Sequence, residues 1–187
     1  MRISALLAAT AMLAACNSGS GLRDAFDSRQ NAGACPPAGS VYTASRVVEL
    51  SDPESPTFNN ISYTGEIVDV RLFCRYASDE PVRAEIEVDF AFGKGPQATS
   101  NTHDYTYWVA VTRRSGKVLN KERFTVRADF GNGDVIGASE LVQRIVIPRA
   151  DTTISAANFE VLVGFELTED QVEFNKNGQR FRLGAGQ

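Results

Sequence analysis

Residues 82–92 read Val-Arg-Ala-Glu-Ile-Glu-Val-Asp-Phe-Ala-Phe. Apolar and polar side chains alternate along this stretch up to its end, so a strand would have one apolar face and one charged face. This pattern is typical of a strand in an antiparallel sheet, with one face in the core and the other in water. We therefore predict a half-buried antiparallel strand here.

Other segments of the chain repeat this alternation. Three are clear, at 68–74, 124–130 and 159–167, and three are weaker, at 45–50, 105–112 and 141–147. In the first of these, Val68, Val70, Leu72 and Cys74 are expected to share the core face. Turn-forming residues separate the segments at 78–81, 93–96, 115–117 and 131–134. The spacing predicts an all-β protein: a single antiparallel two-sheet β-sandwich of about seven strands.

The end of the chain has two interpretations. Thr168-Glu169-Asp170-Gln171 has the form of a capping box, and Asn177-Gly178 can end a helix in the left-handed conformation. These signals favour a short C-terminal helix. Asn-Gly also forms tight hairpin turns, so a hairpin within 169–183 is the alternative.

The start of the chain has the features of a targeting signal. Met1-Arg2 is followed by an apolar stretch, Ile3 to Ala15, that only Ser4 and Thr10 interrupt. A helix of this length spans about 20 Å, whereas the hydrocarbon core of a bilayer is about 30 Å thick. A signal sequence fits better than a membrane span.

The stretch ends Leu13-Ala14-Ala15-Cys16, which resembles the lipobox of bacterial lipoprotein precursors. The resemblance covers residues 1–16. It implies a diacylglyceryl thioether on Cys16, cleavage before that residue, and acylation (palmitate) of the new amino terminus. Asn17 stands where aspartate would retain a lipoprotein in the inner membrane, so the resemblance implies the outer membrane. The alternative is an ordinary secretory signal in which Cys16 is incidental.

These signals divide the chain into three parts. We expect a signal peptide at 1–15, the lipidated cysteine and a flexible tether at 16–34, and the sandwich at 35–187. The sandwich is similar in pattern to immunoglobulin and fibronectin type III domains. It lacks the tryptophan between two cysteines that is usual in immunoglobulin domains, because Trp108 follows both Cys35 and Cys74.

The two remaining cysteines are predicted to form a disulfide. Cys35 and Cys74 belong to an exported protein, where oxidation is the default. A metal or redox role would need partners that the sequence lacks: it has one histidine and no Cys-x-x-Cys. The formal net charge of −4, without a basic cluster, argues against binding nucleic acid.

Three groups of residues could suggest chemistry, and each has a simpler interpretation. His103 and Asp104 are adjacent on a strand and face opposite ways, so we expect an exposed loop histidine and no catalytic pair. Residues 129–134 (Asp-Phe-Gly-Asn-Gly-Asp) are loosely calcium-like but suit a glycine-rich turn. A third set could hold paired catalytic carboxylates, yet it resembles a solvated sheet surface. It consists of Glu66, Asp69, Glu85, Glu87 and Asp89.

The aromatic residues Tyr105, Tyr107 and Trp108 could contact a partner. On a regular strand the tyrosines share one face and Trp108 lies on the other. Core packing is favoured for the tyrosine face, and Trp108 is the best candidate for a contact residue.

We expect a non-enzymatic outer-membrane lipoprotein that acts through protein contacts as an accessory or assembly component of an envelope complex. The domain would face the periplasm, with no catalytic residue, metal or cofactor beyond the lipid on Cys16, and no small-molecule substrate is identified. The alternative is a periplasmic module that binds glycan or peptide through Tyr105, Tyr107 or Trp108.

Overall fold

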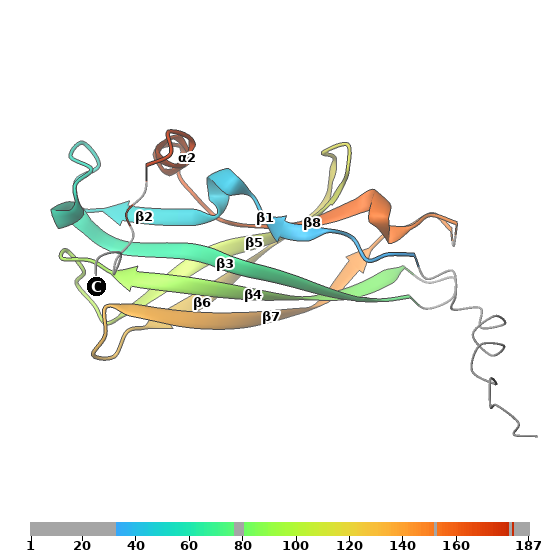
Figure 1. Cartoon of the computed structure of the whole chain (residues 1–187), viewed down its shortest axis with the longest axis horizontal. Helices are drawn as coiled ribbons and strands as arrows, with labels where there is room; N and C mark the ends of the chain where they lie inside the picture. The colour runs from blue at the N-terminus through green and yellow to red at the C-terminus, as the bar shows by residue number, and fades with distance from the viewer. Residues whose placement is uncertain (1–32, 77–80, 152, 180, 182–187) are drawn as a thin grey trace, which may run out of the picture.

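The computed structural model describes residues 33–76, 81–151, 153–179 and 181. Eight strands form two sheets that face each other along the length of the molecule (Figure 1). The prediction of an all-β, two-sheet architecture with a short C-terminal helix is confirmed.

The first sheet has the strand order β1-β8-β5-β6. Its strands are β1 (Ala38–Ser40), β8 (Phe159–Phe165), β5 (Thr102–Arg113) and β6 (Val118–Asp129). The strand β1 was not predicted. It has three residues and runs parallel to β8, whereas every other pairing is antiparallel.

The second sheet has the strand order β2-β3-β4-β7. Its strands are β2 (Arg46–Leu50), β3 (Ile61–Arg75), β4 (Val82–Lys94) and β7 (Val135–Ile147). Short 3₁₀ turns precede three of the strands: η2 (Tyr42–Ala44), η3 (Phe58–Asn60) and η4 (Ala156–Asn158). The weak segments at 45–50, 105–112 and 141–147 therefore do form strands.

The core lies between the sheets, and β4 supplies much of it as predicted. Six of its side chains are no more than 3% exposed, and they are Val82, Ala84, Ile86, Val88, Phe90 and Phe92. The ring centroids of Phe92 and Tyr105 are 4.2 Å apart, and those of Phe90 and Tyr107 are 5.1 Å apart. Aromatic contacts between the two sheets thus form the centre of the core.

The prediction for the apolar face of β3 is wrong at Val68. Ile67 is paired with Phe90 and Asp69 with Asp89, so Val68 is the extra residue of a β-bulge. Ile67 is buried and the Val68 residue is 62% exposed. Beyond the bulge, Val70, Leu72 and Cys74 do pack against the core.

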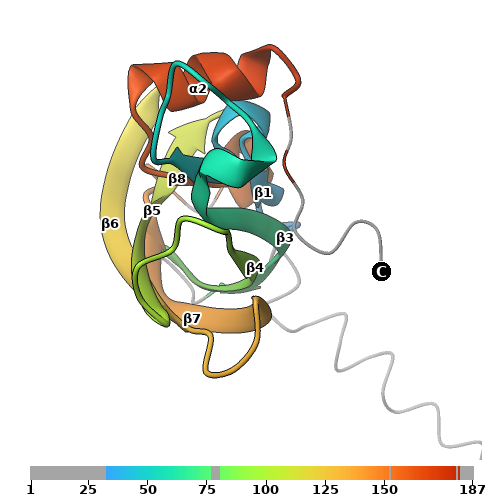
Figure 2. The same ribbon diagram turned by 90° about the vertical axis from the view of Figure 1, so that its left-hand side faces the viewer.

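The C-terminal segment contains helix α2 (Glu169–Lys176), which settles the choice between helix and hairpin in favour of the helix. The Thr168 hydroxyl accepts from the backbone N–H of Gln171, and the Gln171 side chain accepts from the backbone N–H of Thr168. Gly178 follows the helix with φ of 71°. The helix packs on η2 and β2, along one side of the sandwich (Figure 2).

A disulfide joins Cys35 to Cys74, as expected, with their Cα atoms 5.7 Å apart. It ties the segment before β1 to the end of β3. Because β1 and β3 belong to different sheets, this link connects the two layers at one end of the sandwich.

Candidate functional site

Trp108, the residue that we expected to contact a partner, lies on the outer face of β5. It is half-buried, and its Nε1–H donates to the carbonyl oxygen of Phe165 at 3.1 Å. The indole covers Gly164 on the neighbouring strand, where an added Cβ would lie 2.5 Å from the Trp108 ring. The glycine is needed for this close approach.

Charged side chains surround this tryptophan. The Lys121 ammonium lies 4.5 Å from the centroid of the Trp108 ring, in cation–π geometry. Glu166 accepts two hydrogen bonds from the Arg123 guanidinium at 3.1 and 3.3 Å. The hydrogen bonds from Arg123 hold the pKa of the Glu166 carboxyl below its ordinary value. Trp108, Lys121, Arg123 and Glu166 therefore form an outer cluster with few free polar groups.

Tyr105 and Tyr107 are less exposed than Trp108. They are 3% and 1% exposed, and both belong to the core. The Tyr105 hydroxyl donates to the Thr64 carbonyl at 2.9 Å. Burial raises the pKa of both phenols well above their ordinary value. Of the three aromatic candidates, only Trp108 has a surface that a folded partner can reach.

The structure separates His103 from Asp104, as expected for adjacent strand residues. Asp104 accepts from Arg127 at 2.7 and 2.9 Å on the outer face. The expectation of a loop histidine is wrong, because His103 lies within β5 and its side chain is 22% exposed. Its ring stacks on Tyr63 at 4.0 Å, and its Nε2 lies 3.0 Å from Glu49 Oε1.

This histidine–glutamate contact lacks the third group that nucleophilic catalysis needs. In the part of the chain that the structure describes, no serine, threonine or cysteine is hydrogen-bonded to His103. The contact between His103 and Glu49 joins β5 to β2, and no local sequence pattern predicts it. A structural role at the end of the sandwich accounts for the contacts that the residue makes.

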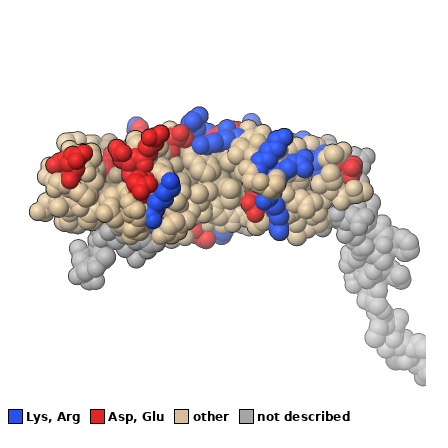
Figure 3. All heavy atoms as spheres, turned by 90° about the horizontal axis from the view of Figure 1, so that it is seen from above, with Lys and Arg blue, Asp and Glu red and all other residues tan. Residues whose placement is uncertain are grey.

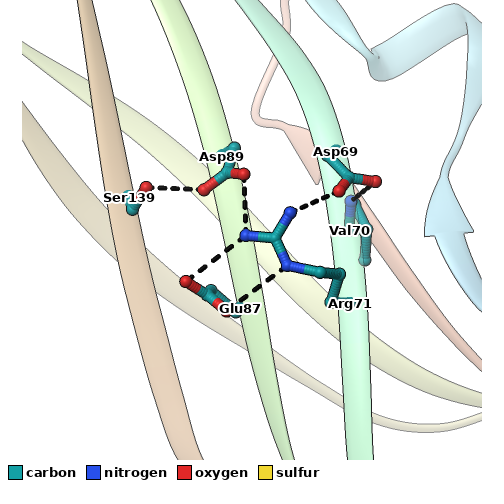
Figure 4. Close-up of polar contacts among 6 residues, drawn as sticks. All are labelled: Asp69, Val70, Arg71, Glu87, Asp89 and Ser139. Carbon is teal, nitrogen blue, oxygen red and sulfur yellow. Dashed lines mark hydrogen bonds and ion pairs between the residues drawn. The ribbon is translucent and has the colours of Figure 1, made fainter.

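The carboxylates of the second sheet converge on one arginine (Figure 4). Arg71 Nη2 lies 2.7 Å from Asp89 and 3.3 Å from Glu87, and Arg71 also contacts Asp69. The Ser139 hydroxyl donates to Asp89 from the neighbouring strand. These groups lie on the outer face of β3, β4 and β7.

The contacts in this cluster neutralise the charge of its carboxylates. A general acid needs a carboxyl whose pKa is raised toward the working pH. Here the hydrogen bond from Ser139, together with Arg71, lowers the pKa of Asp89. Glu66 and Glu85, the other acidic residues that we considered, do not belong to this network.

The glycine-rich segment 129–134 forms a turn and does not gather ligands for calcium. The backbone N–H of Gly131 donates to Asp129 Oδ1, and Asp134 lies 3.5 Å from the Lys94 ammonium. Gly131 has φ of 53°, which favours glycine. Across the described residues, no group of three or more histidine, cysteine, aspartate or glutamate side chains could hold a metal ion.

One buried polar residue, Arg46, was not among the predicted site residues. Arg46 is 9% exposed, and its Nε and Nη2 atoms are buried without hydrogen-bond partners. Its guanidinium lies 5.2 Å from the centroid of the Tyr42 ring. In the sequence Arg46 occupies an ordinary polar strand position, so no local signal distinguishes it.

The wider surface has no strong single-sign patch on the face drawn in Figure 3. Acidic groups gather mostly toward one end of that face and basic groups toward the middle and the other end. No helix within the described residues has the length and apolarity needed to cross a membrane. Leu13, Ala14, Ala15 and Cys16 lie outside the residues that the structure describes.

Comparison with known proteins gives no relative for this chain. No protein-family model, curated protein or solved structure matches it.

Proposed function

We propose that this chain is a bacterial lipoprotein, anchored in the outer membrane through Cys16, whose sandwich faces the periplasm. In this proposal the domain is not an enzyme. It acts through protein contacts, as an accessory or assembly component of an envelope complex. The observation that carries the proposal is the sequence Leu13-Ala14-Ala15-Cys16 after a short apolar stretch.

The anchoring follows from the energetics of acyl chains. Each buried methylene contributes about 0.8 kcal/mol, so two or more chains hold a protein on a bilayer without a spanning helix. The segment between Cys16 and the sandwich then serves as a tether. The disulfide between Cys35 and Cys74 suits an oxidising compartment such as the periplasm.

The surface chemistry supports contact in preference to catalysis. Arg71 is surrounded by carboxylates, Arg123 is bound to Glu166, and Arg127 is bound to Asp104. Polar groups that pair with each other are poorly placed to act on a substrate. Trp108 is half-buried beside such pairs, in keeping with the enrichment of tryptophan in protein interfaces.

Mass spectrometry of the N-terminal peptide of the processed protein tests the anchor. We expect a peptide that begins at Cys16 and carries diacylglycerol and an amide-linked acyl chain. Cys16→Ser is the control and should release the folded domain from the membrane fraction. An unmodified Cys16 thiol, or cleavage at another bond, would disprove the anchor.

A pull-down after gentle detergent extraction tests the mode of action. A protein that co-purifies in fixed stoichiometry would support the assembly role, and Trp108→Ala should weaken its capture. Retention of the purified protein on peptidoglycan or glycan beads, without a protein partner, would instead support the binding module. Turnover of a substrate by the purified protein would overturn both.

A further inference from the structure

The outer edge of β7 is a free sheet edge. In the second sheet β7 pairs with β4 on one side, and among the described residues no strand pairs with its other side. In Figure 1 it forms the lower boundary of this sheet, with β6 of the other sheet behind it. A free edge carries unpaired backbone N–H and C=O groups that can pair with another strand.

The other three edges are protected in ways that natural proteins use. The strands β1 and β2 have only three and five residues. The outer row of β6 contains Lys121, Arg123 and Arg127, and basic residues on an edge discourage pairing.

The strand β7 is longer, and its protection is confined to one inward-row charge, Glu140, and to the bulge near its end. It has 13 residues, and its outer row before the bulge is uncharged. That row consists of Val135, Gly137, Ser139 and Leu141. Val135 and Leu141 are each 52% exposed. An edge of this length with an uncharged outer row favours the addition of a strand.

The regular part of β7 has defined limits. The turn at 131–134 closes one end. At the other end, Ala84 pairs with Ile145 and Ile86 with Val142, so Gln143 and Arg144 form a bulge, where Arg144 has φ of 65°. The segment 136–142 between these limits is regular, and its central residue is Ser139.

We infer that the partner of this edge is a second copy of the chain, paired antiparallel through β7 about a twofold axis at Ser139. In this arrangement Ser139 lies opposite its own copy, Gly137 opposite Leu141, and Ile136 opposite Val142. These pairs bring apolar or small residues together, and cross-strand pairs of this kind stabilise a sheet. Glu140 lies opposite Ala138 and is the one charged residue within 136–142.

Charge complementarity selects this register. The axis at Ser139 brings Asp134 of each copy toward the bulge of the other, which contains Arg144. Asp134 lies 3.5 Å from Lys94, but its side chain is 76% exposed and can reach a second cation. The axis at Gly137 would place Asp134 opposite Glu140, a like-charge pair that destabilises. The axis at Ala138 would leave Asp134 and Arg144 without charged partners.

Edge pairing alone makes a small interface, well below the roughly 1,200 Å² that stable complexes bury. We therefore expect a weak dimer in solution. If the proposed lipid anchor holds, confinement of the copies to one membrane raises their effective concentration and favours pairing. This enhancement rests on the proposed function, whereas the pairing itself does not.

Cysteine crosslinking tests the register in a variant that carries Cys16→Ser. Its two remaining native cysteines, Cys35 and Cys74, are both held in the disulfide and cannot crosslink. Directly opposed residues have Cβ atoms about 4.5–5.5 Å apart, near the range that a disulfide bridges. Ser139→Cys should therefore form covalent dimers under mild oxidation. A mixture of Gly137→Cys and Leu141→Cys chains should form mixed dimers.

Gly137→Cys alone is the matched control. An added Cβ at Gly137 meets only the Phe90 carbonyl, at 3.7 Å, so the variant should fold. In the inferred register Gly137 lies four residues away from its own copy, and we expect about tenfold less covalent dimer than with Ser139→Cys. Glu140→Gln, which removes the remaining charge near the axis, should increase the dimer fraction in analytical ultracentrifugation.

Equal crosslinking of Ser139→Cys and Gly137→Cys, or efficient mixed dimers of Val135→Cys with Leu141→Cys, would overturn the inferred register. A strictly monomeric protein at high concentration, with no crosslinking through Ser139→Cys, would overturn the dimer. Neither result affects lipidation of Cys16 or capture of a partner, so failure here is distinguishable from failure of the proposed function.

Discussion

Gly164 is the residue where a single methyl group should matter most on the outer face of the first sheet. A Cβ there would lie 2.5 Å from the Trp108 ring and 2.8 Å from the Ala44 Cβ. Gly164→Ala should lower the free energy of unfolding by about 1–3 kcal/mol, because the indole must shift. Chemical denaturation measures this loss.

Gly39 in β1 provides the control, because an added Cβ there meets nothing within 4 Å. Gly39→Ala should change the free energy of unfolding by less than about 1 kcal/mol. If Gly164→Ala changes the free energy of unfolding as little as Gly39→Ala does, then Trp108 is held less tightly than its hydrogen bond to Phe165 indicates.

Asp89 shows how single residues make stability depend on pH. The hydrogen bond from Ser139 and the charge of Arg71 lower the pKa of this carboxyl in the folded protein. The resulting stabilisation is present above the pKa that Asp89 has in the unfolded chain, and it is lost as the pH falls through the lower, folded pKa. Arg71→Gln should raise the pKa of Asp89, as followed by NMR titration of its carboxyl carbon.

Arg127→Gln is the matched control for this titration. It removes the partner that lowers the pKa of Asp104 on the other sheet and should leave the pKa of Asp89 unchanged. A pKa of Asp89 that does not respond to Arg71→Gln would contradict the network drawn in Figure 4.

A buried side-chain amide helps to attach helix α2 to the sandwich. Asn175 is 2% exposed, and its Nδ2 donates to the carbonyl oxygens of Thr43 and Arg46, both at 2.8 Å. Asn175→Ala leaves these carbonyls unpaired and should cost about 1–3 kcal/mol of stability. Hydrogen exchange in 169–176 should accelerate more than in the core strands.

The exposed Asn177 serves for comparison, since its Nδ2 donates to the Glu173 carboxylate, which belongs to the same helix. Asn177→Ala should change stability by less than about 0.5 kcal/mol. Equal effects of the two substitutions would show that Asn175 does not hold the helix to the sandwich.

The disulfide acts on the whole molecule because it connects the two layers. It closes a loop with a sequence separation of 39, and the chain-entropy model gives such a link about 4 kcal/mol. Replacing both Cys35 and Cys74 by serine should lower the free energy of unfolding by about 2–4 kcal/mol. Thermal unfolding measures the change, and Cys16→Ser should leave it unaffected. A double variant as stable as the parent would show that the core suffices without the link.

Local patterns predicted most of the elements but only part of the candidate site. The alternation at 82–92 and 159–167 predicted β4 and β8, because inward and outward side chains must alternate along a strand. The pairing of His103 with Glu49, separated by 54 positions, left no local pattern. The three-residue strand β1 was missed because it is too short to show periodicity.

By itself, the sequence determined most of the segments that form strands, the cap of helix α2 and the cysteine pair, since these are visible in the chain without its fold. Only the tertiary structure decided that Val68 faces outward, that Asp69, Glu87 and Asp89 meet at Arg71, and that β7 lies at the edge of its sheet. These features depend on register and strand order, which are set by contacts between segments far apart in the chain.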